Sequence, residues 1–210
     1  MVGCFTIHYS PITIHTPPMA ATPSTMLALE TPAPDFSLPD VTTGKTVSLA
    51  DFAENKALLV IFLCAHCPYV IHVKDELARL GRDYAGKGVG IVGITANDIA
   101  GYPQDAPKPT AEFARAAGFH FPVVFDETQS VAKAYTAACT PDFFLFDARR
   151  RLAYRGQLDS SRPGRGTSDG ADIRAALDAL LSGKSADPDQ KPGIGCNIKW
   201  KPGNEPAYFA

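Results

Sequence analysis

Apolar runs and periodic apolar positions divide the chain into strand-sized and helix-sized segments. Residues 57–63 (ALLVIFL) and 89–95 (VGIVGIT) are continuous apolar runs, which are typical of strands buried on both faces of a sheet. Between them, apolar residues recur at helical spacing among charged ones, at Val70, Val73, Leu77 and Leu80. The pattern therefore predicts a central strand that leads directly into a helix, followed by a second buried strand.

The other segments carry shorter signals. A hairpin is predicted around Thr43-Gly44, and the proline-rich stretch 97–109 is predicted to be a loop placed to overhang a site. Thr110 is expected to cap a helix that reaches Ala117. The remaining expected elements are a strand over residues 121–126, a short helix over 129–135, a β-hairpin turning at 148–150 and a last helix over 171–181.

This order of elements predicts an α/β fold, with a central mixed β-sheet flanked by helices and an N-terminal β-hairpin before it. Residues 1–30 lack apolar periodicity and are expected to form a flexible N-terminal extension. Residues 31–185 form the expected domain. Residues 186–210 carry large apolar groups such as Ile198 and Trp200, so we expect this C-terminal tail to pack onto the domain.

Composition narrows the classes of partner. With 210 residues, 45% hydrophobic and 20% charged, the chain is long and apolar enough for one compact core. Its net charge is -2 and it has no long run of Lys or Arg, which argues against nucleic acid as a partner. Its longest apolar run is strand-sized, far below the ~20 residues of a membrane span. We therefore expect a soluble protein with no nucleic-acid or membrane partner.

Cysteine usage bears on the compartment. Five cysteines are too few for a disulfide scaffold in a chain of this length, and a C-x-x-C pair beside a strand-helix unit is typical of a reducing compartment. The first 18 residues lack the cationic start and uninterrupted apolar centre of a secretory signal. These features favour a cytoplasmic location.

The C-x-x-C pair, Cys64 and Cys67, stands where the buried strand ends and the helix begins. Reactive groups collect at the carboxyl ends of central strands in open sheets. Pro68 suits the first helical position, so Cys67 is expected at the N-cap, where the helix amides and dipole lower the pKa of its thiol. Cys64 is near enough to close a disulfide with Cys67, and His66 is a candidate for tuning the thiolate. No cofactor is indicated.

Four segments of the chain, CAHCPYV, AYTAACTPDFFLFD, YRGQLDSSRPG and QKPGIGCNIKWKPGNEP, are more specific than the cysteine spacing alone. Together they resemble the peroxiredoxin-like branch of the thioredoxin superfamily, whose members are described as redoxin or alkyl-hydroperoxide-reductase/thiol-specific-antioxidant-like proteins. The resemblance runs from about Met19 to the C-terminus. It implies a thioredoxin fold.

The resemblance also implies roles for particular residues. Thr140-Pro141 would be a cis-proline turn that faces the cysteines and binds the extended backbone of a partner. Cys139 would then lie near the pair as a third redox thiol, with simple buried packing as the alternative. The candidate catalytic residues are Cys67, Cys64 and Cys139, and the candidate substrate-contacting residues are Thr140, Pro141, His66 and Pro68.

Two activities fit these residues. In dithiol-disulfide exchange, the Cys67 thiolate attacks the disulfide of a protein or small-thiol partner, and Cys64 or, as the second choice, Cys139 resolves the mixed disulfide. In a thiol peroxidase the oxidant is a peroxide. Cys67-Pro68 resembles the peroxidatic Cys-Pro of peroxiredoxins, but that family has a Thr in the place of Cys64 and an Arg beside the sulfur. Exchange therefore ranks first, and the oligomeric state stays open, a homodimer included.

A third hypothesis is a non-enzymatic metal site. Zinc or copper would find thiolate and imidazole ligands if the tail folded Cys196 inward, the set being Cys64, Cys67, Cys139, Cys196 and His66. The spacing after the first pair matches no dedicated metal motif. We therefore assign no metal ligand, and Cys196 is otherwise interpreted as a buried residue of the tail.

Overall fold

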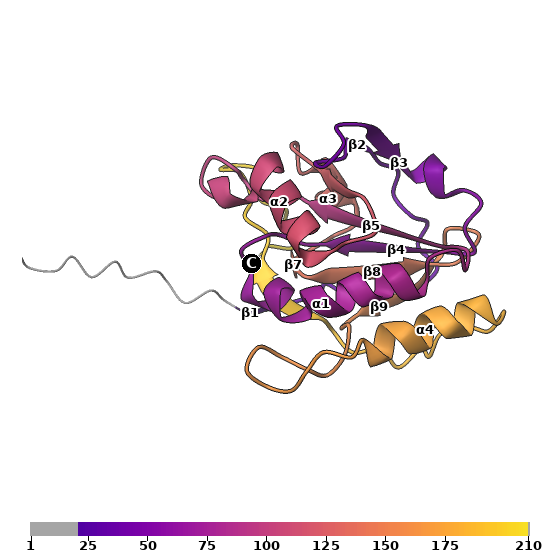
Figure 1. Cartoon of the computed structure of the whole chain (residues 1–210). Coiled ribbons are helices and arrows are strands. Elements are labelled where there is room, and N and C mark those ends of the chain that lie inside the picture. The colour runs from indigo at the N-terminus through magenta and orange to yellow at the C-terminus, as the bar shows by residue number, and fades with distance from the viewer. Residues whose placement is uncertain (1–20, 210) are drawn as a thin grey trace, which may run out of the picture.

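A five-stranded mixed sheet forms the centre of the computed structural model, which describes residues 21–209 (Figure 1). The strand order is β6-β5-β4-β8-β9, with bounds Val123–Phe125, Val89–Thr95, Ala57–Phe62, Asp142–Phe146 and Leu152–Gly156. Strands β4, β5 and β6 are parallel, and β8 runs antiparallel to both β4 and β9. The expected mixed sheet, in which parallel strands enter an antiparallel pair, is confirmed.

Helices cover both faces of this sheet (Figure 1). They are α1 (Pro68–Asp83), α2 (Pro107–Ala117), α3 (Ser130–Ala134) and α4 (Ala171–Leu181), with short 3-10 turns η1 (Leu49–Phe52) and η2 (Pro103–Asp105). None of the helices within residues 21–209 is both long and apolar enough to cross a membrane.

The side chains of β4 point alternately into two apolar layers, because successive residues of a strand face opposite sides of the sheet. Leu59 and Ile61 pack in the layer formed by α1 and α4. Val60 and Phe62 pack in the other layer, with α3 and Trp200 of the tail. Burial on both faces explains why the sequence of β4 is a continuous apolar run rather than an alternating one.

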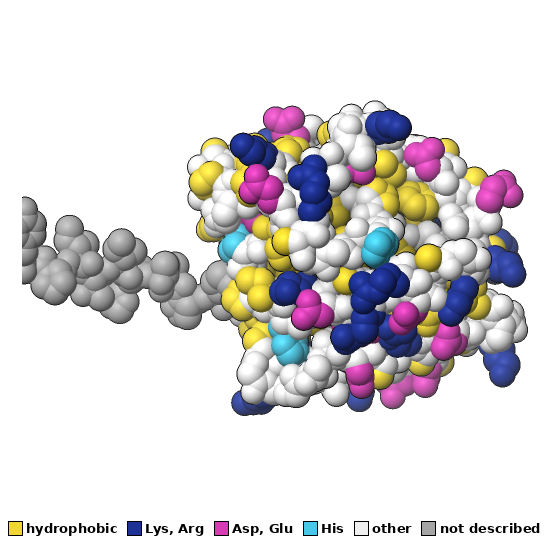
Figure 2. Space-filling model, in the orientation of Figure 1, with side chains coloured by type: hydrophobic (Ala, Val, Ile, Leu, Met, Phe, Trp, Pro, Cys, Tyr) yellow, Lys and Arg dark blue, Asp and Glu magenta, His cyan; other side chains and the backbone are white. Residues whose placement is uncertain are grey.

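A buried carboxylate ties α1 to α4. Glu76 is 1% exposed and pairs with Arg79 of its own helix at 2.6 Å and with Arg174 of α4 at 2.7 Å. Arg174 also pairs with Asp83 at 2.8 Å. Lys and Arg side chains gather over α1 and α4 (Figure 2), and these pairs offset part of their charge.

Two small sheets flank the central one. The expected N-terminal hairpin is confirmed as β2 (Ser37–Pro39) paired with β3 (Thr46–Ser48). The second small sheet has the order β1-β10-β7 and joins both ends of the described chain, with bounds Ala21–Pro23, Ile194–Asn197 and Cys139–Thr140. The tail is therefore packed, as expected.

Strand β1 falls within the expected N-terminal extension. Ala21–Pro23 pairs antiparallel with β10, and Leu27 and Leu29 pack against the core, so this part of the extension is held rather than free. The rest of the expected extension, residues 1–20, lies outside the described residues.

The start of α2 differs from the expectation that Thr110 caps it. The helix begins at Pro107 with Ala106 at the N-cap, and the Thr110 hydroxyl donates a hydrogen bond to the Asp105 carbonyl at 3.0 Å from within the first turn. Pro103 and Pro107 stand at the first positions of η2 and α2, where the missing N–H would have no helical partner anyway.

Candidate active site

Cys64 and Cys67 bracket the passage from β4 to α1. Cys64 follows the end of β4 closely, and Cys67 is the N-cap of α1, as expected from Pro68. The first helical turn is closed by the Ile71 amide, which donates to the Cys67 carbonyl at 2.9 Å. All four cysteines of the described chain are free thiols. The helix N-terminus therefore presents its amides to the second thiol of the pair.

Thr140 contacts both thiols of the pair. Its carbonyl oxygen lies 3.0 Å from the Cys67 Sγ, which donates to it in the thiol form, and its Oγ1 lies 3.4 Å from the Cys64 Sγ. The Thr140-Pro141 bond is cis, as the resemblance implied. This bond lies where the chain passes from β7 of the small sheet to β8 of the central sheet. The fold thus brings the predicted turn against the cysteines.

A third sulfur lies against Cys67, and it belongs to the tail. The Sγ atoms of Cys196 and Cys67 are 2.8 Å apart. Cys139 is also buried, but its Sγ contacts the Pro141 carbonyl at 3.6 Å and makes no hydrogen bond to another sulfur within residues 21–209. The catalytic role assigned to Cys139 stays a prediction, whereas Cys196 was considered near the pair only as a metal ligand, on the condition that the tail folded it inward.

The tail strand covers the thiols. Cys67 is 0% exposed, and Cys64 and Cys196 are each 1% exposed. Thr140 and Pro141, expected to contact substrate, are likewise buried, whereas Pro68 is exposed. None of these three thiols is open to a partner in this conformation.

The loop that was expected to overhang a site supplies a buried carboxylate beside Cys64. Asp105 is 0% exposed; its Oδ1 accepts from the Ala65 amide at 3.0 Å and its Oδ2 accepts from the Asn97 side chain at 2.8 Å. The Nδ1 of His66 lies 2.7 Å from the same Oδ2, and the His66 ring stacks on Tyr102. The imidazole is thus held against the carboxylate.

The three neighbouring thiols differ in acidity. Hydrogen bonds from the thiols of Cys196 and Cys64, assisted by the Val70 amide, hold the pKa of Cys67 far below its usual range despite burial. The pKa of Cys64 is raised by its hydrogen bond to Cys67, by burial and by the charge of Asp105. The pKa of Cys196 is raised mainly by its hydrogen bond to Cys67. Cys67 is therefore the thiolate of the cluster, and the other two are its proton-bearing neighbours.

The described residues do not assemble the thiolate-rich metal site that the sequence suggested as a third hypothesis. The donor atoms that converge are those of Cys64, His66 and Asp105, which lie within 4.8 Å of one another. This group contains one sulfur. The hydrogen bonds of Asp105 to Ala65 and Asn97 give its carboxylate a structural role without an ion.

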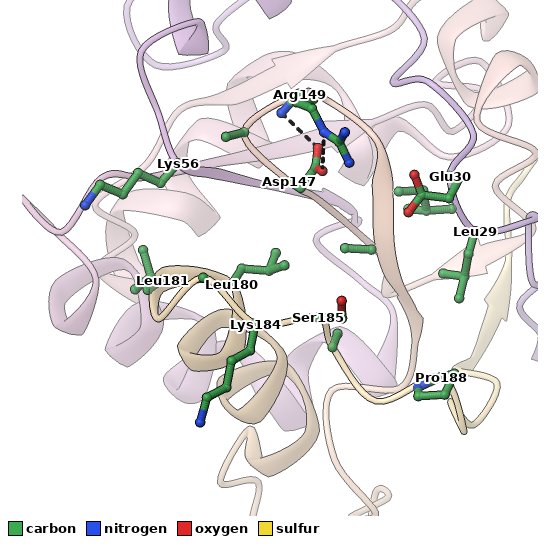
Figure 3. A pocket seen from close by; sticks show the side chains of 15 residues that line it. Leu29, Glu30, Lys56, Asp147, Arg149, Leu180, Leu181, Lys184, Ser185 and Pro188 are labelled. Atoms are coloured by element: carbon green, nitrogen blue, oxygen red, sulfur yellow. Dashed lines mark hydrogen bonds and ion pairs between the residues drawn. The ribbon is translucent and has the colours of Figure 1, made fainter.

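A wide groove lies far from the cysteines. It has a volume of about 640 Å³ and is bordered by the hairpin turn after β8 and by the end of α4, with Asp147, Leu180 and Lys184 among its lining residues (Figure 3). Asp147 follows β8 and Lys56 precedes β4, so the groove is at the end of the sheet opposite to Cys64. It takes no part in the thiol site.

Sequence reasoning assigned no redox role to Cys196 and no role to Asp105, although both lie in this site. Cys196 is paired with Cys67 across 129 residues, and Asp105 is bonded to Ala65 across 40. A short-range pattern has no means of reporting such contacts. Two sequence signals pointed toward them: the apolar residues of the tail, which predicted that it packs onto the domain, and the position of Asp105 in the loop expected to overhang a site.

Comparisons with known proteins agree with this geometry. The profile of the Redoxin family matches residues 28–177. An uncharacterized conserved protein from Geobacillus kaustophilus is 51% identical, with a TM-score of 0.86 over 88% of this chain and 98% of that one. A hypothetical protein from Sinorhizobium meliloti is 48% identical, with a TM-score of 0.84 over 86% of this chain and 98% of that one.

A more distant structure identifies the fold. A thiol:disulfide interchange protein of the thioredoxin family from Chlorobium tepidum is 22% identical, with a TM-score of 0.58 over 73% of this chain and 98% of that one. The expected thioredoxin fold is thereby confirmed. No curated protein matches the chain.

Proposed function

The chain belongs to the Redoxin family, and from this premise we propose that it is a thiol-disulfide oxidoreductase that reacts through Cys67 and Cys64. One observation carries the proposal. Both thiols lie at the start of α1, and both contact Thr140, so one backbone segment orients the pair. Because one fold hosts many thiol chemistries, the argument rests on this geometry.

The acidities of the two thiols support an order of events. The Cys67 thiolate attacks one sulfur of a partner disulfide, a Cys67-partner bond forms, and the other partner sulfur leaves as a thiolate that takes up a proton. Cys64 then loses its proton and attacks the Cys67 sulfur, which releases the second partner thiol. The partner gains two electrons and two protons, and Cys64 and Cys67 end as a disulfide. Asp105 lies beside Cys64, and its charge keeps that thiol protonated until the mixed disulfide has formed.

Peroxide reduction is the alternative activity. It would need a donor, an Arg in the resembling family, beside the Cys67 sulfur to stabilise the leaving oxygen. Within residues 21–209 no arginine donates a hydrogen bond to Cys67, whose sulfur contacts Thr140 and Cys196. This supports disulfide exchange with a protein or small-thiol partner, and we place that exchange in the reducing cytoplasm.

Stopped-flow kinetics test the proposal. The reduced full-length protein is mixed with hydrogen peroxide or with oxidised glutathione, and free thiols are counted during the reaction, beside Cys67→Ser and Cys64→Ser. We expect rapid oxidation by the disulfide, no reaction in Cys67→Ser, and a Cys64→Ser protein with strongly reduced turnover. Rapid oxidation by peroxide that vanishes in Cys67→Ser alone would establish the peroxidase instead.

A further inference from the structure

Strand β10 brings Cys196 to the proposed nucleophile with a defined register. In the antiparallel pairing of β10 with β7, Cys196 stands opposite Thr140, the residue that contacts both thiols of the pair. The Cys196 and Cys67 sulfurs are 2.8 Å apart. A disulfide bond is ~2.05 Å long, so closure requires a shift of about 0.8 Å. Cys196 is thus within reach of bond formation.

The neighbouring glycine makes this approach possible. A Cβ atom built on Gly195 would overlap the carbonyl group of Thr140 and come within 3.1 Å of the Pro141 nitrogen. Any other residue at 195 would therefore push β10 away from β7. The close approach of Gly195 to Thr140 therefore holds the next residue, Cys196, against the cysteine pair.

The helix N-terminus faces both sulfurs of this contact. The Val70 amide favours the thiolate of Cys67, and the Tyr69 amide acts in the same direction on Cys196, as does the charge of Lys199. A negative charge that moves from one sulfur to the other therefore stays next to α1 and its dipole. Such a shared environment is what an exchange between these two sulfurs requires.

We propose that Cys196 is a third redox-active thiol, which forms a disulfide with Cys67 while β10 occupies the edge of β7 that an extended partner segment would take. This inference deepens the proposed function and rests on it. Its chemistry starts from the Cys67-partner mixed disulfide. Cys196 loses its proton, its sulfur bonds to the Cys67 sulfur, and the partner leaves as a thiol, so that Cys67 and Cys196 are oxidised and the partner disulfide is reduced to two thiols.

The two resolving thiols have different structural consequences. A Cys64–Cys67 disulfide leaves β10 free to move. A Cys67–Cys196 disulfide fixes the tail over Thr140 and leaves Cys64 as a free thiol. A dithiol reductant would be needed to reopen the second form. The oxidation state of Cys196 therefore determines whether the tail is fixed over the cysteine pair.

Disulfide mapping tests the proposal. The full-length protein is oxidised with oxidised glutathione, its free thiols are blocked with iodoacetamide, and tryptic peptides are analysed without reduction. Trypsin separates the cysteines of interest into residues 57–74, 134–149 and 185–199. We expect a cross-link between 57–74 and 185–199 in the wild type, with a larger yield in Cys64→Ser, where the competing thiol is absent.

Matched variants define the outcome. The cross-link should persist in Cys139→Ser, which removes another buried thiol of the same small sheet, and disappear in Cys196→Ser. In the Cys64→Ser background, Gly195→Val should lower its yield at least tenfold, with circular dichroism to verify the fold. If Cys64 and Cys67 form their disulfide while Cys196 is always alkylated, also in Cys64→Ser, the inference is overturned and the proposed function stands. Cys67 left unoxidised throughout would overturn both.

Discussion

The sulfurs of Cys67 and Cys196 lie 2.8 Å apart, although 129 residues separate the two cysteines in the chain. One sulfur stands at the N-cap of α1 and the other on the central strand of the small sheet. The C-terminal tail therefore contributes both to the acidity of the proposed nucleophile and to its burial.

Replacing Cys196 by Ala should raise the pKa of Cys67, because the hydrogen bond from the Cys196 thiol is the largest contributor to its low value. In the wild type we expect thiolate absorbance at 240 nm to persist well below pH 8.5, the ordinary midpoint of a cysteine. In Cys196→Ala the titration should move to higher pH, and in Cys139→Ala it should stay. An unchanged titration in Cys196→Ala would show that the helix N-terminus alone sets the acidity.

Replacing Asp105 by Asn should lower the pKa of Cys64. That pKa is raised first by the hydrogen bond to Cys67, then by burial, then by the Asp105 charge, and the substitution removes the last of these. The step in which Cys64 attacks the mixed disulfide should then proceed at lower pH, which the pH-rate profile of disulfide turnover measures. Asp98→Asn, a partly exposed acid of the same loop, serves as control and should leave the profile in place. A profile that moves to higher pH contradicts the assignment.

Replacing Trp200 by Ala should loosen the tail. Trp200 is 8% exposed and packs edge-on against Tyr208 at 6.4 Å, so truncation should cost about 3 kcal/mol of unfolding free energy. Release of β10 should also speed the reaction of native Cys67 with Ellman's reagent, by about tenfold for each 1.4 kcal/mol lost from tail packing.

The matched control for Trp200 is Phe209→Ala. Phe209 is 39% exposed in the same tail, so its loss should change stability by about 0.5 kcal/mol or less. If Cys67 reacted equally fast in the Trp200→Ala protein and in the wild type, the buried residues of the tail would not control access to the Cys67 sulfur.

Replacing Asp142 by Asn should flatten the dependence of stability on pH. Asp142 is buried, and burial raises its pKa to about 7 while the Ala138 amide donates to its Oδ2 at 3.1 Å. Because the unfolded value is about 3.9, the stability that this carboxyl contributes is fully present below pH ~4 and is lost as the pH rises through 7. Asn keeps an acceptor without the charge.

Urea unfolding at pH 5 and pH 8 measures this effect. Asp142→Asn should be more stable than the wild type at pH 8, by up to about 4 kcal/mol, and the gain should shrink at pH 5. A difference of the same size at both pH values would assign the effect to packing rather than to ionisation.

Much of the secondary structure around the cysteine pair was predictable from the local sequence. The apolar run of β4, the helical spacing of Val70 and Leu77 and the proline after Cys67 each encode an element through a repeat of a few residues. These three signals together place a cysteine pair at the end of a buried strand and the start of a helix. The conformation of Thr140-Pro141 came from the resemblance of whole segments.

Only the tertiary structure decided which groups from distant parts of the chain contact Cys64 and Cys67. The family resemblance offered Cys139 as the third thiol, next to the implied cis-proline turn, but strand pairing sets which sulfur faces Cys67, and β10 brings Cys196 there. Asp105 reaches Cys64 in the same way, from a loop whose position depends on the strands it connects. Periodicity specifies an element and the face it buries, whereas contacts across 40 or 129 residues depend on how all the elements pack at once.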